Sequence, residues 1–167
     1  SLDVWKRAFT FCGEYLYYVW DDDYTDEKNY LSKVSSLDFS SNKDDYWYTK
    51  DGFAFSMVTS DGEYVYSTMY KNSQTKCETI ISKYSSDFRE MTDEFDISDK
   101  CKELVGERFW ISSINVVDNQ IGISLNGPNE YDESWNSYGL YHLTVNGSNL
   151  IWDTMRDFGT GTEYIVI

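Results

Sequence analysis

Residues 45–70 read DYWYTKDGFAFSMVTSDGEYVYSTMY and carry the clearest strand and turn signals in the chain. Two Asp-Gly pairs, Asp51-Gly52 and Asp61-Gly62, separate three runs in which apolar and polar residues alternate. Glycine supplies the positive φ that tight hairpin turns require, so Asp-Gly between alternating runs is the strongest short-range hairpin signal. The stretch therefore predicts a β-meander over residues 45–50, 53–59 and 63–70.

Further strands are predicted on both sides of this meander from β-branched and aromatic content. They cover residues 14–20, 109–117, 120–125, 139–145, 149–154 and 162–167. Turns of two to four residues join most of them, which is too short for the crossover that parallel pairing needs. The sequence predicts an α+β protein of one domain, residues 1–167, with a largely antiparallel, curved sheet of about seven to nine strands.

Two places in the chain suggest helices that pack on this sheet. Residues 2–11 place Val4, Trp5, Ala8 and Phe9 at helical spacing after a potential Ser1 cap. A two-helix insert is predicted at about residues 74–91 and 99–105. Its first helix carries an apolar stripe of Cys77, Ile80, Ile81, Tyr84, Phe88 and Met91. Its second is bracketed by Ser98 as N-cap and Gly106 as C-cap.

Three cysteines, Cys12, Cys77 and Cys101, occur without a C-x-x-C pair, which disfavours a zinc knuckle and a thioredoxin-like site. If the two insert helices pack together, Cys77 and Cys101 either form a disulfide or remain two small buried thiols. The sequence leaves both alternatives open.

The charge is strongly negative: 29 Asp and Glu face 14 Lys and Arg, a formal net charge of −15. Such a surface repels nucleic acid and anionic lipid and attracts basic partners. Aromatic residues reach 18%, so the charge belongs to an ordered scaffold rather than to a disordered acidic tail. We expect a protein partner with a basic face, no direct nucleic-acid binding and no membrane insertion by this segment.

Catalytic signatures are missing from the sequence. His142 is the one histidine, and no G-x-S-x-G elbow or phosphate-binding glycine loop occurs. The run 21–27 does not match the EF-hand pattern. The sequence therefore predicts no catalytic residue, no metal site, no cofactor and no enzyme activity.

Two loops that mix carboxylates with aromatic residues are the candidate partner-binding sites, because carboxylates steer basic partners and Tyr or Trp supplies rigid contact area. The first contains Asp21, Asp22, Asp23, Asp26 and Glu27; the second contains Glu130, Tyr131, Asp132, Glu133 and Trp135.

The small size, the acidity, the aromatic hairpin from Tyr46-Trp47-Tyr48 to Phe53-Ala54-Phe55 and the absence of enzyme motifs resemble those of bacterial immunity proteins. The chain is similar in general character to the TipC-type proteins that protect Gram-positive bacteria from secreted LXG toxins. This resemblance implies an inhibitor that covers a basic or catalytic surface of a toxin.

Two alternatives remain: a lipocalin-like barrel that binds a ligand or sugar outside the cytoplasm, and a DNA mimic of the anti-restriction kind. Because the chain starts at Ser1 without Met, we expect that a leader or anchor was removed upstream, which slightly favours a secreted or membrane-anchored location over the cytoplasm.

Overall fold

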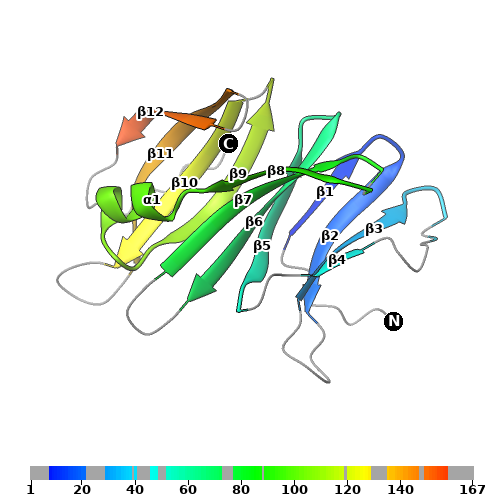
Figure 1. Cartoon of the computed structure of the whole chain (residues 1–167), viewed down its shortest axis with the longest axis horizontal. Coiled ribbons are helices and arrows are strands. Elements are labelled where there is room, and N and C mark those ends of the chain that lie inside the picture. Colours follow the sequence, from blue (N-terminus) through cyan, green and yellow to red (C-terminus); the bar gives the residue numbers. More distant parts are fainter. Residues whose placement is uncertain are drawn as a thin grey trace.

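The computed structural model describes residues 8–21, 29–38, 40, 46–48, 52–72, 77–87, 89–118, 120–128, 135–146 and 149–157. Within these ranges the protein is almost entirely β: twelve strands form three four-stranded sheets, and one short helix lies between the second and third sheet in sequence (Figure 1). All strand pairs in these sheets are antiparallel, as predicted.

Each sheet is built from four strands that follow one another in the chain. The N-terminal sheet contains β1 (Ala8–Cys12), β2 (Tyr15–Asp21), β3 (Asn29–Ser35) and β4 (Tyr46–Tyr48). The middle sheet contains β5 (Ala54–Ser60), β6 (Tyr64–Asn72), β7 (Cys77–Ser85) and β8 (Met91–Asp96). After α1 (Ser98–Val105), the C-terminal sheet contains β9 (Trp110–Val117), β10 (Gln120–Pro128), β11 (Trp135–Asn146) and β12 (Asn149–Asp157).

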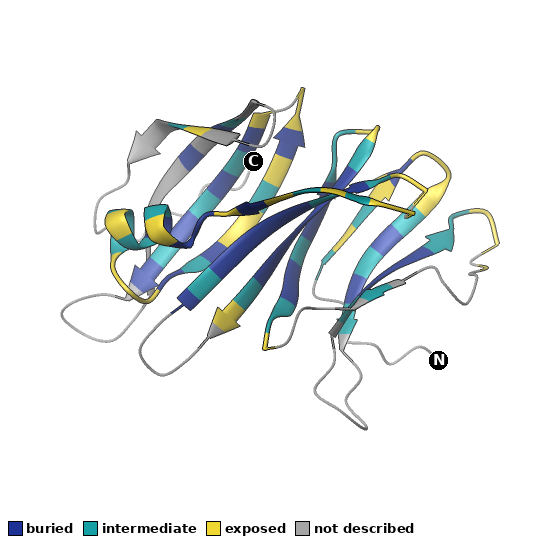
Figure 2. Ribbon diagram, in the orientation of Figure 1, coloured by how far each residue is buried: buried dark blue, intermediate teal, exposed yellow. Residues whose placement is uncertain are grey.

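The middle sheet is buried on both faces and separates two hydrophobic cores. Val65, Met69 and Tyr84 join the core shared with the N-terminal sheet. Tyr66 and Ile81, which point to the opposite face, join the core shared with the C-terminal sheet and α1. Figure 2 shows the result as nearly continuous dark blue along β6 and β7. The three sheets are therefore stacked in a row.

The first two sheets are sequence repeats. Gly13-Glu14-Tyr15-Leu16-Tyr17 recurs as Gly62-Glu63-Tyr64-Val65-Tyr66, and residues 31–36 (LSKVSS) recur as residues 81–86 (ISKYSS). The pairing registers are also the same, because Tyr17 lies opposite Lys33 and Tyr66 lies opposite Lys83. The N-terminal and middle sheets are therefore two copies of one four-stranded unit, as in repeat proteins whose units bury their apolar faces on one another.

The repeated units are stacked front to back. We call the face that carries the motif tyrosines the tyrosine face, and the opposite one the back face. The tyrosine face of the N-terminal sheet packs on the back face of the middle sheet, where Tyr17 donates its hydroxyl hydrogen to the carbonyl of Ser86. The tyrosine face of the middle sheet in turn packs on the C-terminal sheet through Tyr66 and Ile81.

The predicted helix at 74–91 is wrong, because residues 77–85 and 91–96 are the strands β7 and β8. Double-sided burial explains the error. Cys77 and Ile81 face the C-terminal sheet, whereas Ile80 and Tyr84 face the N-terminal sheet. Each face of the strand carries apolar residues at every second position or at multiples of two. Taken together, the apolar residues of the two faces follow one another at intervals of three, one and three residues, which is also the spacing of an amphipathic helix. Phe88 lies outside the described residues.

The predicted N-terminal helix is also wrong where the structure describes it, since Ala8–Cys12 is the edge strand β1; residues 1–7 lie outside the described part. The prediction at 99–105 is confirmed as α1, with Gly106 as C-cap. Ser98 is not the N-cap: its hydroxyl accepts a hydrogen bond from the Thr79 amide at 2.8 Å and ties α1 to β7. The predicted two-helix insert and single curved sheet are therefore wrong: the described residues form one short helix and three small sheets.

The hairpin predicted over 53–70 is confirmed as β5 and β6. The first hairpin of the predicted meander is wrong, because β4 pairs with β3 in the N-terminal sheet, whereas β5 begins the middle sheet. The Asp61-Gly62 turn shows why aspartate suits a hairpin turn. Asp61 Oδ1 accepts hydrogen bonds from the amides of Glu63 at 2.9 Å and Tyr64 at 2.7 Å, while Gly62 has φ 95°. All three cysteines are buried, and no disulfide joins Cys77 and Cys101. The predicted strand at 162–167 lies outside the described residues.

Candidate functional site

The back face of the N-terminal sheet is the end of the stack, and its side chains belong to neither core of the described residues. We call this surface the open face. Cross-strand pairing arranges the residues of this face in three rows. The rows are Phe9–Tyr18–Ser32, Phe11–Leu16–Val34 and Trp20–Tyr30. Phe9 and Phe11 are 62% and 60% exposed. The other apolar members are half-buried.

Contacts within the open face hold its aromatic rings in place. Trp20 and Tyr30 stack at 4.5 Å between ring centroids, and Phe9 meets Phe11 edge to face at 6.4 Å. Trp20 Nε1 donates a hydrogen bond of 2.7 Å to Ser32 Oγ. Burial raises the pKa of Tyr18 above its ordinary value, so this side chain is neutral at physiological pH. The face is therefore apolar and pre-organised.

Equivalent positions in the other two sheets are buried. Counting residues from the first hairpin turn of each sheet identifies equivalent positions. The row of Phe11, Leu16 and Val34 is equivalent to Ser60, Val65 and Tyr84 in the middle sheet. In the C-terminal sheet it is equivalent to Val116, Ile121 and Leu143. Val65, Ile121 and Leu143 are fully buried under the preceding sheet. No described sheet covers the row in the first unit.

At the other end of the stack the surface is more polar. The outer face of the C-terminal sheet presents Ser113, Asn115, Gln120, Ser124 and Thr144, with the aliphatic residues Val117 and Ile151 among them. Ser113 Oγ donates a hydrogen bond of 2.8 Å to Ser124 Oγ. Repeat stacks require polar outer faces on their terminal units for solubility. The C-terminal end has such a polar surface, and the aromatic N-terminal end departs from it.

The first acidic loop predicted from the sequence is attached to the open face. Asp21 is the last residue of β2 and pairs with Asn29 of β3; Asp22, Asp23, Asp26 and Glu27 lie outside the described residues. The chain leaves the open face after Trp20 and returns to it at Tyr30, with these five carboxylates in the connection.

The second predicted loop belongs to a different sheet. Trp135 begins β11 opposite Pro128 of β10, and Glu130, Tyr131, Asp132 and Glu133 lie outside the described residues. Because the middle sheet separates the N-terminal from the C-terminal sheet, the structure does not bring Asp21 and Trp135 together. The two loops are therefore separate candidates.

The sequence interpretation did not identify the open face. Its strand β3 received no prediction, because the LSKVSS run of residues 31–36 is short and polar. The signal that would have found it is the repeat: ISKYSS and GEYVY mark the same hairpin in the middle sheet.

Other kinds of site find little support in the described part of the chain. It contains no group of three or more His, Cys, Asp or Glu residues placed to hold a metal ion. The helix α1 is too short and too polar to cross a membrane. Comparison of the sequence with protein-family models and with curated proteins gives no match. Functional inference therefore depends on the geometry of the molecule itself.

Proposed function

We propose that this protein is a non-catalytic, acidic inhibitor that binds another protein through its open face, most simply as an immunity protein that neutralises a toxin. The observation that carries the proposal is the exposure of Phe9 and Phe11 at positions whose counterparts in the C-terminal sheet, Ile114 and Val116, pack in the core. An exposed apolar and aromatic sheet face gains free energy when another surface packs on it, and exposed aromatic patches of this kind mark interaction sites.

The energetics favour a protein partner. Trp and Tyr side chains dominate binding hot spots because they bury a large area at a small cost in conformational entropy. Trp20, Tyr18 and Tyr30 are held by their neighbours before binding, so ordering them costs little.

Charge selects the kind of partner. The net charge of −15 attracts a basic surface at long range, and the carboxylates of residues 21–27 belong to the chain segment that connects Trp20 with Tyr30 of the open face. Opposite fields accelerate the encounter, while pairs of charges at the rim set the register. A toxin with a basic face that includes an exposed apolar patch fits both properties.

The experiment is a neutralisation assay. Each reading frame adjacent to this gene is expressed alone and together with this protein, and growth is recorded. We expect one neighbour to be toxic alone and harmless in the presence of the wild-type chain. The double variant Phe9→Ser/Phe11→Ser should lose this protection.

Val117→Ser is the matched control, because Val117 is as exposed as Phe11 but lies on the C-terminal sheet. Thermal unfolding should show that all variants remain folded, since none of the three side chains belongs to a core. Protection that survives the double variant, or the absence of any neutralised neighbour, would contradict the proposal.

A further inference from the structure

The contact between the N-terminal and middle sheets shows how a back face of this repeat is covered. Val65 and Tyr84, on the back face of the middle sheet, share one core with Tyr17 and Leu31 on the tyrosine face of the N-terminal sheet. The ring of Trp47 in β4 lies 5.3 Å from the Tyr84 ring, measured between centroids. The apolar part of this contact is one sheet face lying on another.

Two hydrogen bonds complete the contact, and both end on the turn that follows β7. The Tyr17 hydroxyl donates to the carbonyl of Ser86, and Lys33 Nζ donates to the carbonyl of Asp87 at 3.1 Å. Lys33 is buried, so a carbonyl acceptor and the adjacent Tyr15 ring stabilise its charge. A tyrosine and a lysine of the covering face thus recognise one turn of the covered sheet.

The N-terminal sheet has an equivalent turn after β3. Counted along the repeat, Ser36 is equivalent to Ser86. Leu37 occupies the position of Asp87, and its side chain is 80% exposed. The turn follows directly on a strand of the open face, so a partner that covers this face can reach it.

The two turns close with the same hydrogen bond. The Ser35 amide donates to the Ser40 carbonyl at 2.8 Å. In the middle sheet the Ser85 amide donates to the Glu90 carbonyl at 2.9 Å. The turns therefore have the same length, and the carbonyls that follow β3 have the same places as the two acceptors that follow β7.

The back faces of the two sheets also match position by position. Phe9 is equivalent to Val58, and Trp20 is equivalent to Met69. Val58 and Met69 are both buried in the core beneath the N-terminal sheet. The open face is thus equivalent to a surface that is covered, and at these two positions its side chains are larger.

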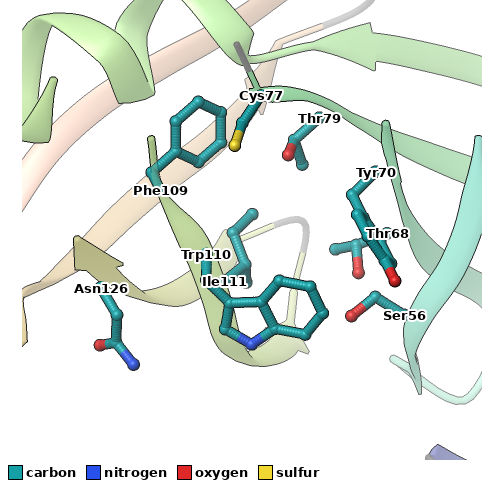
Figure 3. A pocket seen from close by; sticks show the side chains of 9 residues that line it. All are labelled: Ser56, Thr68, Tyr70, Cys77, Thr79, Phe109, Trp110, Ile111 and Asn126. Atoms are coloured by element: carbon teal, nitrogen blue, oxygen red, sulfur yellow. The ribbon is translucent and has the colours of Figure 1, made fainter. Parts of the chain in front are cut away.

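The contact between the middle and C-terminal sheets is a less suitable comparison. The C-terminal sheet lacks the Gly-Glu-Tyr motif, and a pocket of about 330 Å³ lies between the two sheets (Figure 3). Tyr70 and Thr79 line this pocket from the middle sheet, and Phe109 and Trp110 line it from the start of the C-terminal sheet. The contact between the two repeated units therefore indicates best how the open face is covered.

We propose that the partner covers the open face with a β-sheet and repeats the contact between those units. A tyrosine of that sheet donates its hydroxyl hydrogen to the Ser36 carbonyl, and a lysine donates to the Leu37 carbonyl. Apolar side chains beside them pack on Leu16 and Val34, the equivalents of Val65 and Tyr84. A lysine in this place also suits the net charge of −15.

This inference rests on the proposed function, because the partner is the toxin that the open face neutralises. A second copy of this chain is a poorer occupant. The tyrosine faces of its N-terminal and middle sheets are already buried within its own stack.

A tandem chain tests the geometry without the toxin. Residues 1–53 are fused ahead of the full chain, so that the added unit presents Tyr17 and Lys33 to the original open face. Urea unfolding followed by tryptophan fluorescence should remain a single transition. Its m value should be roughly one third higher than that of the wild-type chain, because m scales with the surface exposed on unfolding. An unchanged m value would show that the added unit does not pack, which would overturn the inference.

Two tyrosine variants of the added unit locate the contact. Tyr17→Phe should raise the equilibrium constant of unfolding of the tandem chain about fivefold, the effect of one hydrogen bond, because the Ser36 carbonyl loses its donor. Tyr18→Phe is the matched control and should have a smaller effect, since successive side chains of a strand point to opposite faces. Equal effects of the two variants would contradict the role assigned to the Ser36 carbonyl.

The complex with the neutralised toxin provides the second test. Hydrogen exchange of the toxin should show added protection in β-strands, and replacing the lysine of those strands with methionine should weaken binding at least tenfold. Protection confined to a helix of the toxin would overturn the inference but leave the proposed function intact, provided that Phe9→Ser/Phe11→Ser still loses neutralisation. Neutralisation that survives this double variant would overturn both.

Discussion

Lys33 and Lys83 occupy the same register position in two consecutive sheets, and each ammonium group lies over the ring of the tyrosine that begins the preceding strand. Lys33 Nζ is 4.6 Å from the centroid of the Tyr15 ring, and Lys83 Nζ is 3.8 Å from that of Tyr64. Such contacts are cation–π interactions. The repeat thus preserves an interaction as well as a sequence, which supports the description of the two sheets as copies of one unit.

The first prediction concerns the different surroundings of these two lysines. Lys33 is buried between sheets, and its Nζ donates a hydrogen bond of 3.1 Å to the Asp87 carbonyl, whereas Lys83 is half-buried. Lys33→Met should lower the free energy of unfolding by about 1.5–3 kcal/mol through loss of a charged hydrogen bond. Lys83→Met should cost about 0.5–1 kcal/mol.

Urea unfolding followed by tryptophan fluorescence measures both. Lys100→Met removes an ion pair on the surface of α1 and should change stability by less than about 0.5 kcal/mol. A larger loss for Lys83→Met than for Lys33→Met would show that the hydrogen bond between the sheets is not the decisive contact.

The second prediction concerns the double-sided burial of β7. Ile80 faces the N-terminal sheet and Ile81 the C-terminal sheet, and both are at most 7% exposed. Each change to alanine should lower the free energy of unfolding by about 2–5 kcal/mol. Thr92→Ala, exposed on β8, should have an effect below about 0.5 kcal/mol in the same urea titration. A negligible cost at either isoleucine would contradict the three-sheet stack.

The third prediction follows from the buried Cys101 thiol. Burial, with a smaller contribution from the Asp96 carboxylate, raises the pKa of Cys101 from 9.0 to about 12. Above pH 9 the unfolded chain therefore releases this proton while the folded chain keeps it. The free energy of unfolding should fall as the pH rises, by up to about 1.4 kcal/mol per pH unit from this group.

Urea titrations at pH 8, 9 and 10 measure this slope, and Cys101→Ala should reduce it. Val116→Ala, which shortens a buried apolar side chain in the same core, is the control and should lower stability while retaining the slope. An unchanged slope in Cys101→Ala would show that other groups, such as the buried tyrosines whose pKa is also raised, dominate the alkaline loss of stability.

The fourth prediction separates the two acidic loops. Asp22→Lys/Asp23→Lys reverses charge in the connection between β2 and β3 of the N-terminal sheet, whereas Asp132→Lys/Glu133→Lys reverses charge in the connection between β10 and β11 of the C-terminal sheet. Stopped-flow association with the neutralised toxin at low salt should slow by about tenfold for the first pair and its salt dependence should weaken. The second pair should have a much smaller effect. The opposite ranking would assign recognition to the C-terminal sheet.

The sequence predicts structure well where local chemistry determines it. The Asp61-Gly62 turn predicts the β5–β6 hairpin because glycine adopts the positive φ observed there, 95°. Gly52 also has a positive φ, 75°, but the strands on its two sides belong to different sheets, so its Asp-Gly signal marks a turn and not a hairpin. The position of Gly106 at the end of α1 follows from the same property. These features depend on few residues that are close in the chain.

The sequence fails where packing determines structure. β7 imitates a helix because Ile80 and Ile81 are buried by different sheets, which no single-face periodicity describes. The open face was missed because the segment that carries Phe9 was interpreted as a helix and residues 31–36 received no prediction, whereas both are strands of the N-terminal sheet. Exposure of this face also depends on what lies beyond the sheet, which no strand sequence describes. Recognition of the Gly-Glu-Tyr repeat would have indicated both features, since it aligns the exposed back face of the N-terminal sheet with the buried back face of the middle sheet.

Hydrogen exchange of the chain with and without the neutralised toxin shows whether the open face is the binding surface. Binding there should add protection to amides in β1, β2 and β3 and leave β9 to β12 unchanged. Protection confined to the C-terminal sheet, with the strands that carry Phe9, Phe11 and Trp20 exchanging as in the free protein, would contradict it.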